Sequence, residues 1–365
     1  MSSATLDGAP IAIEEAYAHA ARLLSEAKFP LIAGLGADAA GARAAILLAE
    51  RLRGAYDHLA SDAILADLDT MRGFTLFTTT PNEARLRGDV ILFVGPGLSE
   101  QWPTLFERLA LEKTVHFQNG APRKVFWLGP KRGEGKIDGV EVEVIPATAE
   151  ALPHTLAALR ARTAGRPVAM AAAATKKLDA VGEALRSAKF GVAVWSGSSI
   201  DQLTVEALQG LLSDLNATTR FTGVPIGARS AGATVTQVSG WMTGFPPRTG
   251  FGRGYPEHDP WRFEATRLVD SGEADAALWI SAYDGEGPGW DGEIPTVTLA
   301  PKGAKKPAQG LFIEVGRPGE AHDALELTQE IASFALRKAT APSDAPSVAT
   351  ALAAIGAKIS EDAAC

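Results

Sequence analysis

The residues best suited to chemistry gather in one Gly- and Pro-rich stretch between Gly223 and Trp261, which reads GVPIGARSAGATVTQVSGWMTGFPPRTGFGRGYPEHDPW. Its cations are Arg229, Arg248, Arg253 and His258. An Arg guanidinium presents planar donors that suit a carboxylate or a phosphate. Glycine lets the backbone approach a ligand or another chain closely. The stretch therefore predicts either a pocket for an acidic ligand or a contact surface.

The aromatic residues of the same stretch favour the contact surface. Trp, Tyr, Phe, Met and Arg are the residue types enriched at protein interfaces. A long ordered loop in a compact domain is usually functional, and we expect one over residues 223–262. The interface candidates are Trp241, Phe245, Tyr255 and Trp261.

The sequence predicts no metal site and no covalent nucleophile in this chain. The single cysteine, Cys365, allows no internal disulfide and no thiolate cluster. The histidines form neither an H-x-H pair nor an i, i+4 pair, so they do not match a zinc site. There is no G-x-S-x-G elbow for a serine nucleophile. The carboxylates of DGEGPGWDGE, Asp284 to Glu293, lack the spacing of a calcium loop and indicate a solvated turn.

Two glycine turns occupy places where a phosphate could bind. Gly34 and Gly36 follow an apolar strand and precede a helix, but Ala39 stands where the third glycine of a dinucleotide fingerprint would be. We therefore favour a strand-to-helix turn that needs small residues. In the similar turn WSGSS, Ser198 or Ser199 is expected to cap the following helix.

The elements that carry these residues repeat along the chain. AKFPLIAGLGADAAGARAAILLAERLRG and AKFGVAVWSGSSIDQLTVEALQGLLSDL each predict a strand, a small-residue turn and a helix. Lys28 and Lys189 give the offset, 161 residues (189 − 28). TTPNEARLRGDVILFVG and HDPWRFEATRLVDSGEADAALWIS continue the pattern with a Pro-led helix and an apolar strand. Strands that alternate with helices or turns predict an α/β fold with mostly parallel sheets.

The expected organisation follows from this repeat. A first α/β half covers residues 1–150, an Ala-rich helical linker 151–186, and a second half 187–342. A tail with one amphipathic helix covers 343–365. With 365 residues, two domains are a better expectation than one.

Composition excludes some classes of partner. A net charge of −8 repels phosphate backbones, so nucleic acid is not an expected partner. The N-terminal residues have no basic region followed by an apolar run, and no later stretch has the length of a membrane span. We expect a cytoplasmic protein with no membrane partner.

The segment TGFPPRTGFGRGYPEHDPWRFEATRLVDSGEADAALWIS resembles the B subunit of formylmethanofuran dehydrogenase, whose members carry similar TGYP, FSRGYP and GEVDAAL-like residues. FPLIAGLGADAAGARAAILLAERLRGA and GDVILFVGPGLSEQWP extend the likeness, so it covers Lys28 to about Lys338. The resemblance implies two related, Rossmann-like, doubly wound halves. Together they would form a shortened molybdopterin oxidoreductase fold of the formate dehydrogenase and DMSO reductase type.

That family binds a tungsten or molybdenum bis-pterin through a cysteine, and a four-iron cluster through an N-terminal cysteine motif. Neither feature is present here, because YDHLASDAILADL, where the metal ligand would fall, contains no cysteine. An active-site arginine of the family maps onto Arg253. Arg253, Arg248 and His258 are thus candidates for a vestigial pocket, and we expect no catalytic residue and no bound cofactor.

The pattern is most similar to the B subunit of the bacterial formyltransferase/hydrolase complex of methylotrophs. The resemblance implies a non-catalytic structural subunit in one-carbon metabolism, specifically in formaldehyde oxidation. The complex would move a formyl group from tetrahydromethanopterin to a methanofuran-like carrier and release it as formate. Partner subunits would carry the formyltransferase and hydrolase activities, with zinc or another metal in the hydrolase.

Two other readings remain open at this point. The chain could be an active formylmethanofuran dehydrogenase-type oxidoreductase subunit with a bound pterin, which metal analysis and cofactor extraction would reveal. It could also be a stand-alone module that binds an acidic ligand through the Arg-rich loop. Purification as a stable monomer without a hydrolase partner would favour this last reading.

Overall fold

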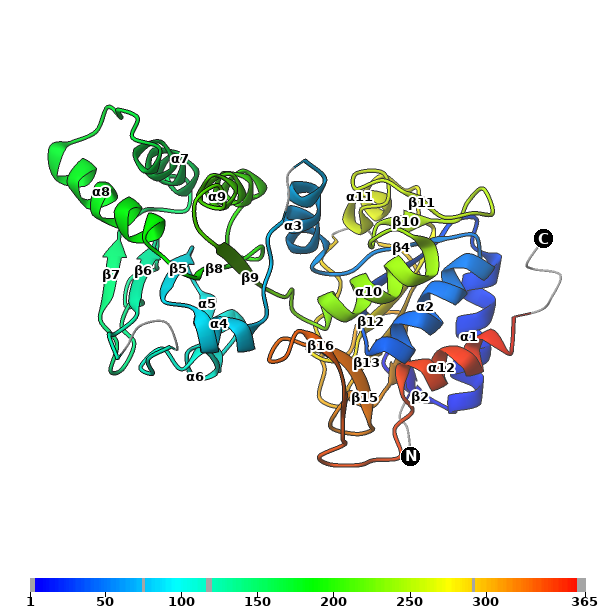
Figure 1. Ribbon diagram of the computed structural model, residues 1–365. Helices are drawn as coiled ribbons and strands as arrows, with labels where there is room; N and C mark the ends of the chain where they lie inside the picture. Colours follow the sequence, from blue (N-terminus) through cyan, green and yellow to red (C-terminus); the bar gives the residue numbers. More distant parts are fainter. Residues whose placement is uncertain (1–3, 74–75, 116–119, 291–292, 360–365) are drawn as a thin grey trace. The chain divides into compact units, whose positions relative to one another are not determined.

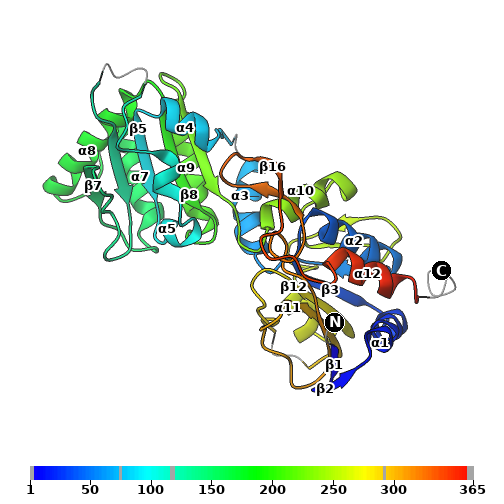
Figure 2. The same cartoon turned by 90° about the horizontal axis from the view of Figure 1, so that it is seen from below.

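The computed structural model describes residues 4–73, 76–115, 120–290 and 293–359, so Cys365 lies outside the described residues. The chain divides into two compact units (Figures 1 and 2). Unit 1 comprises Met1–Ser61, Arg229–Leu327 and Phe334–Cys365. Unit 2 comprises Asp62–Ala228 and Thr328–Ser333.

Unit 1 is built on a sheet whose described strands run in the order β11-β10-β4-β3-β12-β13-β14-β1-β2. The central run from β4 to β14 is parallel, and the strands outside it pair antiparallel. The strands are β1 (Ala4–Leu6), β2 (Ala9–Ile11), β3 (Pro30–Gly36), β4 (Ala55–Tyr56), β10 (Thr249–Gly250), β11 (Glu257–His258), β12 (Ala276–Ser281), β13 (Thr296–Ala300) and β14 (Leu311–Glu314).

Helices cover both faces of this sheet. α1, α2, α10 and α12 pack on one face, in a core with Ile32, Leu278 and Val297, while α11 packs on the other face, with Leu31 and Trp279. Figures 1 and 2 both show α12 beside α2. The helices are α1 (Ile13–Glu26), α2 (Ala39–Arg51), α10 (Gly232–Thr243), α11 (Ala265–Asp270) and α12 (Val348–Gly356).

Unit 2 has a parallel sheet in the order β7-β6-β5-β8-β9, again between two helical layers. One core joins it to α7, α8 and α9, and the other to α4, α5 and α6 (Figure 1). The strands are β5 (Val90–Val94), β6 (Lys124–Leu128), β7 (Val142–Ile145), β8 (Gly191–Ser196) and β9 (Phe221–Ile226). The helices are α3 (Ser61–Gly73), α4 (Pro81–Arg87), α5 (Leu98–Gln101), α6 (Leu105–Leu109), α7 (Leu152–Thr163), α8 (Ala172–Arg186) and α9 (Gln202–Leu215). A separate hairpin consists of β15 (Ala324–Thr328) and β16 (Ser333–Arg337).

The central strands are continuous apolar runs because both of their faces are covered. Every residue of β3, PLIAGLG, is buried, and so is every residue of β5, VILFV. α2 begins where the side chain of Asp38 accepts a hydrogen bond from the Gly41 N–H at 2.9 Å. This cap satisfies one of the free amides of the first helical turn. Local sequence thus fixes both the strand and the start of its helix, as expected.

The two sheets share one strand order. In unit 1 the parallel run is β4-β3-β12-β13-β14, and in unit 2 it is β9-β8-β5-β6-β7. When the two orders are matched, β3 is equivalent to β8 and β12 is equivalent to β5. This is the correspondence that the sequence repeat predicts. Each unit, however, combines the front part of one repeat with the rear part of the other.

The expected boundaries therefore do not match the compact units. The halves 1–150 and 187–342 each contribute to both sheets, because β3 pairs with β12 and β5 pairs with β8. The expected linker 151–186 forms α7 and α8, whose Leu156 and Val181 belong to the core of unit 2. In the tail, Leu352 and Ile355 of α12 are buried in the core of unit 1.

The loop in the structure is also shorter than the expected loop 223–262. Its first residues belong to β9, and residues 232–243 form α10, with Val235 and Val238 buried. The helix α10 has 12 residues and was not predicted, because Gly232 and Gly244 at its two ends are more typical of a loop. The irregular part that remains runs from Gly244 to Glu264 and contains only the short strands β10 and β11.

Candidate functional site

Polar side chains follow the carboxyl end of β4, inside unit 1. Asp57 and His58 come directly after Tyr56 and are 3% and 2% exposed. In open α/β sheets, ligands bind outside the carboxyl ends of the strands. This is therefore where a vestigial site would be sought, and it coincides with the segment YDHLASDAILADL.

Asp57 is held on both carboxylate oxygens. Its Oδ1 accepts a hydrogen bond from Ser61 Oγ at 2.5 Å, and its Oδ2 accepts one from the Ala265 N–H at 2.9 Å. Arg248 Nε lies 3.5 Å from the same Oδ2. Burial raises the pKa of Asp57 to about 6, while the nearby Arg248 and the hydrogen bonds act in the opposite direction.

His58 is fixed as a neutral ring. Its Nδ1 accepts a hydrogen bond from the Ala60 N–H at 3.0 Å. Its Nε2 lies 3.1 Å from the Ser230 carbonyl oxygen, which can only accept, so Nε2 carries the proton. Burial lowers the pKa of His58 to about 4. Both ring nitrogens are thus engaged within the protein.

These residues do not fit the metal centre that the family resemblance implies. A tungsten or molybdenum bis-pterin of that family requires a thiolate, whereas this position presents a carboxylate and an imidazole with their own protein partners. Within the part of the chain that the structure describes, no three His, Cys, Asp or Glu side chains are grouped to hold a metal ion.

Gly34 and Gly36 were expected in a turn after the strand, but they form the carboxyl-terminal part of β3 itself. Gly34 has φ +80°, and a Cβ there would lie 2.5 Å from the Ile280 carbonyl oxygen. Glycine is therefore required at this position by the close approach of β3 to β12, and the expected structural role is kept without a phosphate site. The helix cap expected at Ser198 or Ser199 is wrong, because the side chain of Asp201 accepts the capping hydrogen bond from the Thr204 N–H at 2.8 Å. α9 therefore starts two or three residues further on than the serines suggest.

The three vestigial-pocket candidates do not converge on one cavity. Arg248 is buried, and its carbonyl oxygen accepts a hydrogen bond from His258 Nδ1 at 2.9 Å. Arg253 instead lies at the surface, where its guanidinium is 3.3 Å from Glu257 and 3.5 Å from the Tyr255 hydroxyl. Arg248 and His258 therefore belong to the base of the loop, and Arg253 belongs to its exposed part.

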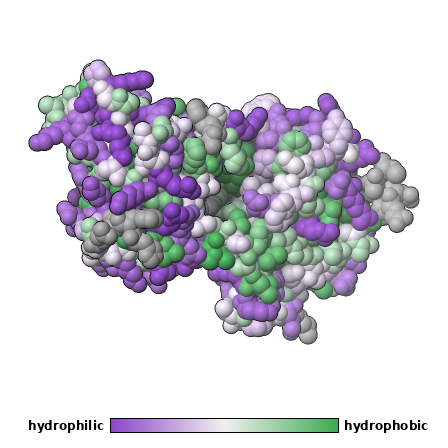
Figure 3. All heavy atoms as spheres, viewed as in Figure 1, coloured by the Kyte–Doolittle hydropathy of each residue, from purple (hydrophilic) through white to green (hydrophobic). Residues whose placement is uncertain are grey.

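The four interface candidates all lie at the surface of unit 1. Trp241 is 66% exposed, Tyr255 53%, Trp261 71% and Phe245 38%. Trp241 contacts the Phe334 ring with centroids 5.0 Å apart, and Phe245 stacks on His258 at 6.0 Å. Figure 3 shows apolar side chains near the β15–β16 hairpin. Large exposed aromatic side chains of this kind are candidates for burial against another chain.

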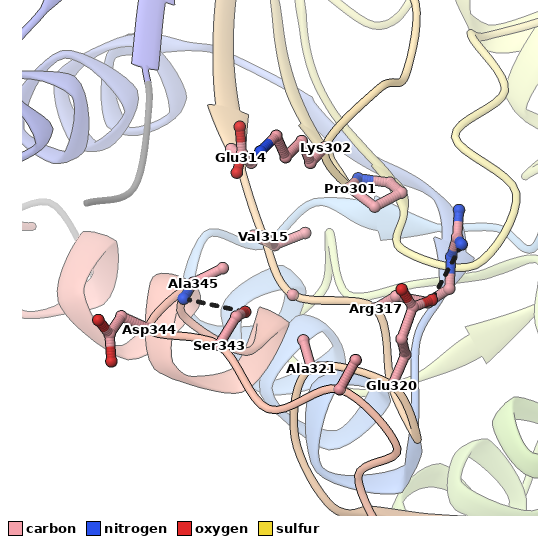
Figure 4. Close-up of a pocket in the computed structure, with 12 residues that line it drawn as sticks. Pro301, Lys302, Glu314, Val315, Arg317, Glu320, Ala321, Ser343, Asp344 and Ala345 are labelled. Carbon is pink, nitrogen blue, oxygen red and sulfur yellow. Dashed lines mark hydrogen bonds and ion pairs between the residues drawn. The ribbon is translucent and has the colours of Figure 1, made fainter.

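A pocket of about 330 Å³ lies at the carboxyl ends of β13 and β14 in unit 1 (Figure 4). Its wall mixes Lys302 and Arg317 with Glu314, Glu320 and Asp344. Arg317 is paired with Glu320 at 3.0 Å and donates to the Tyr283 carbonyl oxygen. A wall with charges of both signs favours no single class of ligand. None of the residues singled out in the sequence lines this pocket.

Asp57 and Ser61 are the residues that sequence reasoning missed, and His58 was set aside among the scattered histidines. The available signal was an Asp-His pair directly after an apolar residue. It was weak because β4 has only two residues. Arg248 was found, but its role at the base of the loop depends on a contact 191 positions away in sequence (248 − 57).

Comparisons with known proteins fit this geometry. The chain is 33% identical over 324 residues to the B subunit of the formyltransferase/hydrolase complex Fhc of Methylorubrum extorquens, covering 87% of this chain and 86% of the relative. It is 27% identical over 284 residues to the B subunit of the tungsten-containing formylmethanofuran dehydrogenase 2 of Methanococcus maripaludis, of which it spans 64%. No family model matches the sequence.

A solved structure covers nearly the whole chain. It is the crystal structure of the Methylorubrum extorquens formyltransferase/hydrolase complex, FhcABCD, with methylofuran. One of its chains superposes with a TM-score of 0.87 and 31% identity over 98% of both chains. The parallel α/β units and likenesses of this extent define the class, a B-type subunit related to that of formylmethanofuran dehydrogenase. Within this class, the chain belongs to the family of the formyltransferase/hydrolase complex B subunits.

Proposed function

We propose that this chain is a non-catalytic structural subunit of a formyltransferase/hydrolase complex. The observation that carries the proposal is the whole-length likeness to a chain of the methylofuran-bound complex, at a TM-score of 0.87. Asp57 and His58 support it, because protein partners engage both side chains at the position where a dehydrogenase would need a metal ligand. We infer that the chain contributes its surface to the assembly and binds no cofactor itself.

The fold is then a shortened molybdopterin oxidoreductase fold with two Rossmann-like, doubly wound parts. Two three-layer units with the same order of parallel strands support this. The duplicated fold keeps its packing although it lacks a metal ligand. This fits a subunit whose role is structural. Catalysis would belong to the partner subunits, with zinc or another metal in the hydrolase.

The reaction sequence of the complex would pass a formyl group from tetrahydromethanopterin to a methanofuran-like carrier and release formate. We place it in the cytoplasm, in one-carbon metabolism and formaldehyde oxidation. In the described residues, no helix combines the length and apolar character needed to cross a bilayer. The negative net charge gives no support to nucleic acid as a partner.

The contact surface proposed for assembly is the exposed aromatic set of unit 1, Trp241, Phe245, Tyr255 and Trp261. Such side chains anchor interfaces when they become buried against a partner. Arg248, Arg253 and His258 would then be features of the irregular loop 244–264 and its base, instead of parts of a ligand pocket.

Affinity purification of the tagged chain from its native host tests this function. We expect hydrolase and formyltransferase subunits to co-purify in a fixed ratio, and no tungsten, molybdenum or pterin to be attributable to this chain. Stoichiometric tungsten or molybdenum on the isolated chain would contradict the proposal and favour the oxidoreductase reading. A monomer that recruits neither partner would favour the acidic-ligand module.

A further inference from the structure

The docking loop, residues 244–264, is long and irregular, yet both of its ends are fastened to one buried ion pair. A free loop of this length would lose conformational entropy when a partner binds it, which weakens binding. A loop that is already fixed before binding avoids most of that cost. The contacts at its base therefore bear directly on its use as an interface.

Arg248 fastens the two sides of the loop to each other. Its backbone N–H donates to the Tyr56 carbonyl oxygen at 3.1 Å, and its carbonyl oxygen accepts from the Asp259 N–H at 3.3 Å. Its guanidinium Nη1 donates to the Pro260 carbonyl oxygen at 3.0 Å. The residue is 9% exposed and has φ +67°, a backbone conformation that a non-glycine residue holds only where its surroundings impose it.

Asp57 fastens the loop to the sheet. One oxygen, Oδ2, accepts from the Ala265 N–H at 2.9 Å, where the loop ends and α11 begins, and lies 3.5 Å from Arg248 Nε near the start of the loop. The other oxygen accepts from Ser61. Asp57 itself follows β4, whose Tyr56 and Ala55 pair with Thr249 and Gly250. One carboxylate thus joins the entry of the loop, its exit and the edge of the parallel sheet.

Between these fastened ends, Phe251 and Phe263 are buried, while two other aromatic side chains point to solvent. Tyr255 and Trp261 are more than half exposed, and Trp261 is held under the Arg267 guanidinium, 4.5 Å from the ring centroid. Arg267 is itself paired with Glu273 at 2.6 Å. The aromatic rings are therefore presented on a fixed backbone instead of a free one.

We propose that Arg248, through its buried pair with Asp57, is a positioning residue that sets the docking loop in its binding conformation before another subunit of the complex contacts Tyr255 and Trp261. This inference rests on the proposed structural function. It gives Arg248 a role in assembly although it would touch no partner residue itself. A stable, preformed loop favours slow dissociation of the assembled complex.

The test compares Arg248→Met with a matched control, Arg51→Met, in complexes reconstituted from purified subunits. Arg51 also donates two hydrogen bonds to backbone oxygens of unit 1, those of Gly356 and Ile359, both at 2.8 Å. We expect Arg248→Met to speed hydrogen exchange in residues 252–262 and to weaken assembly about tenfold. Arg51→Met should leave both the exchange rate and assembly unchanged, although it also removes a guanidinium that donates to backbone oxygens.

A double substitution separates positioning from general destabilisation. If Arg248 acts through Trp261, the two substitutions should not add. The double variant Arg248→Met, Trp261→Ala should bind less than about twofold more weakly than whichever single variant binds more weakly. Effects that multiply fully, or loop exchange that stays at the wild-type rate, would overturn the inference. If Arg248→Met does not fold, Arg248→Lys replaces it, since it keeps a cation near Asp57 but gives up the guanidinium bond to Pro260. A wild-type chain that binds no partner subunit would instead contradict the proposed function itself.

Discussion

Trp195 in β8 donates a hydrogen bond from Nε1 to Oδ1 of Asp67 in α3, at 2.8 Å, inside unit 2. Burial raises the pKa of Asp67 to about 6, and the bond from Trp195 offsets this only in part. Because the indole is neutral, it stabilises the ionised carboxylate less than a cation would. Asp67 therefore binds its proton more tightly in the folded chain than in the unfolded one.

The sign of the pH dependence follows. A raised folded pKa contributes stability that is complete below the unfolded value near 4 and is lost as the pH rises through about 6. Asp67→Asn removes the ionisation and keeps an oxygen for Trp195. We expect it to raise the free energy of unfolding by about 1–2 kcal/mol at pH 8, with little change at pH 4. Urea unfolding at the two pH values measures this, with Asp69→Asn on the same helix as control. A destabilised Asn variant at pH 8 would contradict the assignment.

His58 should give the opposite dependence. Its folded pKa, about 4, lies below the ordinary value of 6.5, so the unfolded chain binds more protons between these values. Stability is complete above about pH 6.5 and falls as the pH decreases toward 4. Between pH 7 and pH 5 the wild type should lose about 2 kcal/mol more than His58→Gln. The control is His154→Gln, because His154 is exposed and should behave as the wild type does. An equal loss of stability in the wild type and in His58→Gln would disprove a buried neutral His58.

Trp241 and Tyr255 should matter for assembly and little for folding. Both are more than half exposed, so their removal uncovers little core. If they become buried against another chain of the complex, Trp241→Ala and Tyr255→Ala should each weaken assembly by about 2 kcal/mol. Titration of the chain into the remaining subunits by calorimetry measures this loss.

The matched control for these aromatics is Leu203→Ala in α9 of unit 2, because Leu203 is 57% exposed and belongs to no proposed contact. It should leave assembly unchanged. Normal affinity of the Trp241 and Tyr255 variants, or an equal loss from Leu203→Ala, would count against the docking surface.

Gly34→Ala should strongly destabilise unit 1. The added Cβ would meet the Ile280 carbonyl oxygen at 2.5 Å, and φ +80° is unfavourable for alanine. We expect a loss of about 2–4 kcal/mol in thermal or urea unfolding. Gly252→Ala is the control, since no atom lies within 4 Å of its added Cβ. Equal stability of the two variants would show that β3 tolerates a side chain at position 34.

The sequence predicted the individual strands and helices better than it predicted which strands pair with one another. The strand and helix at Gly191–Ser196 and Gln202–Leu215 were visible in their apolar spacing and small-residue turn. The exchange of parts between the repeats was not visible, because Leu31 pairs with Ala277 and nothing local indicates which of several equivalent strands a strand will join. α10 was missed because its composition resembles that of a loop.

In the candidate site, too, features that depend on residue type could be predicted, and contacts between distant segments could not. The exposed aromatics could be singled out by residue type alone, and their use as an interface stays a prediction. The cluster around Asp57 could not, because Arg248 and Ala265 lie 191 and 208 positions away in sequence and reach Asp57 only in the folded unit, where β10 pairs with β4. Side chains that meet across the sheet have no spacing that a single sequence reveals.

Formate release by the reconstituted complex, with and without this chain, tests the central claim most directly. The remaining subunits would be mixed with a formylated methanofuran-like carrier, and formate would be measured together with the mass of the assembled species. We predict no formate from this chain alone, incomplete assembly without it, and full assembly and turnover once it is added. Formate production by the isolated chain, or complete assembly and undiminished turnover without it, would contradict a non-catalytic structural subunit.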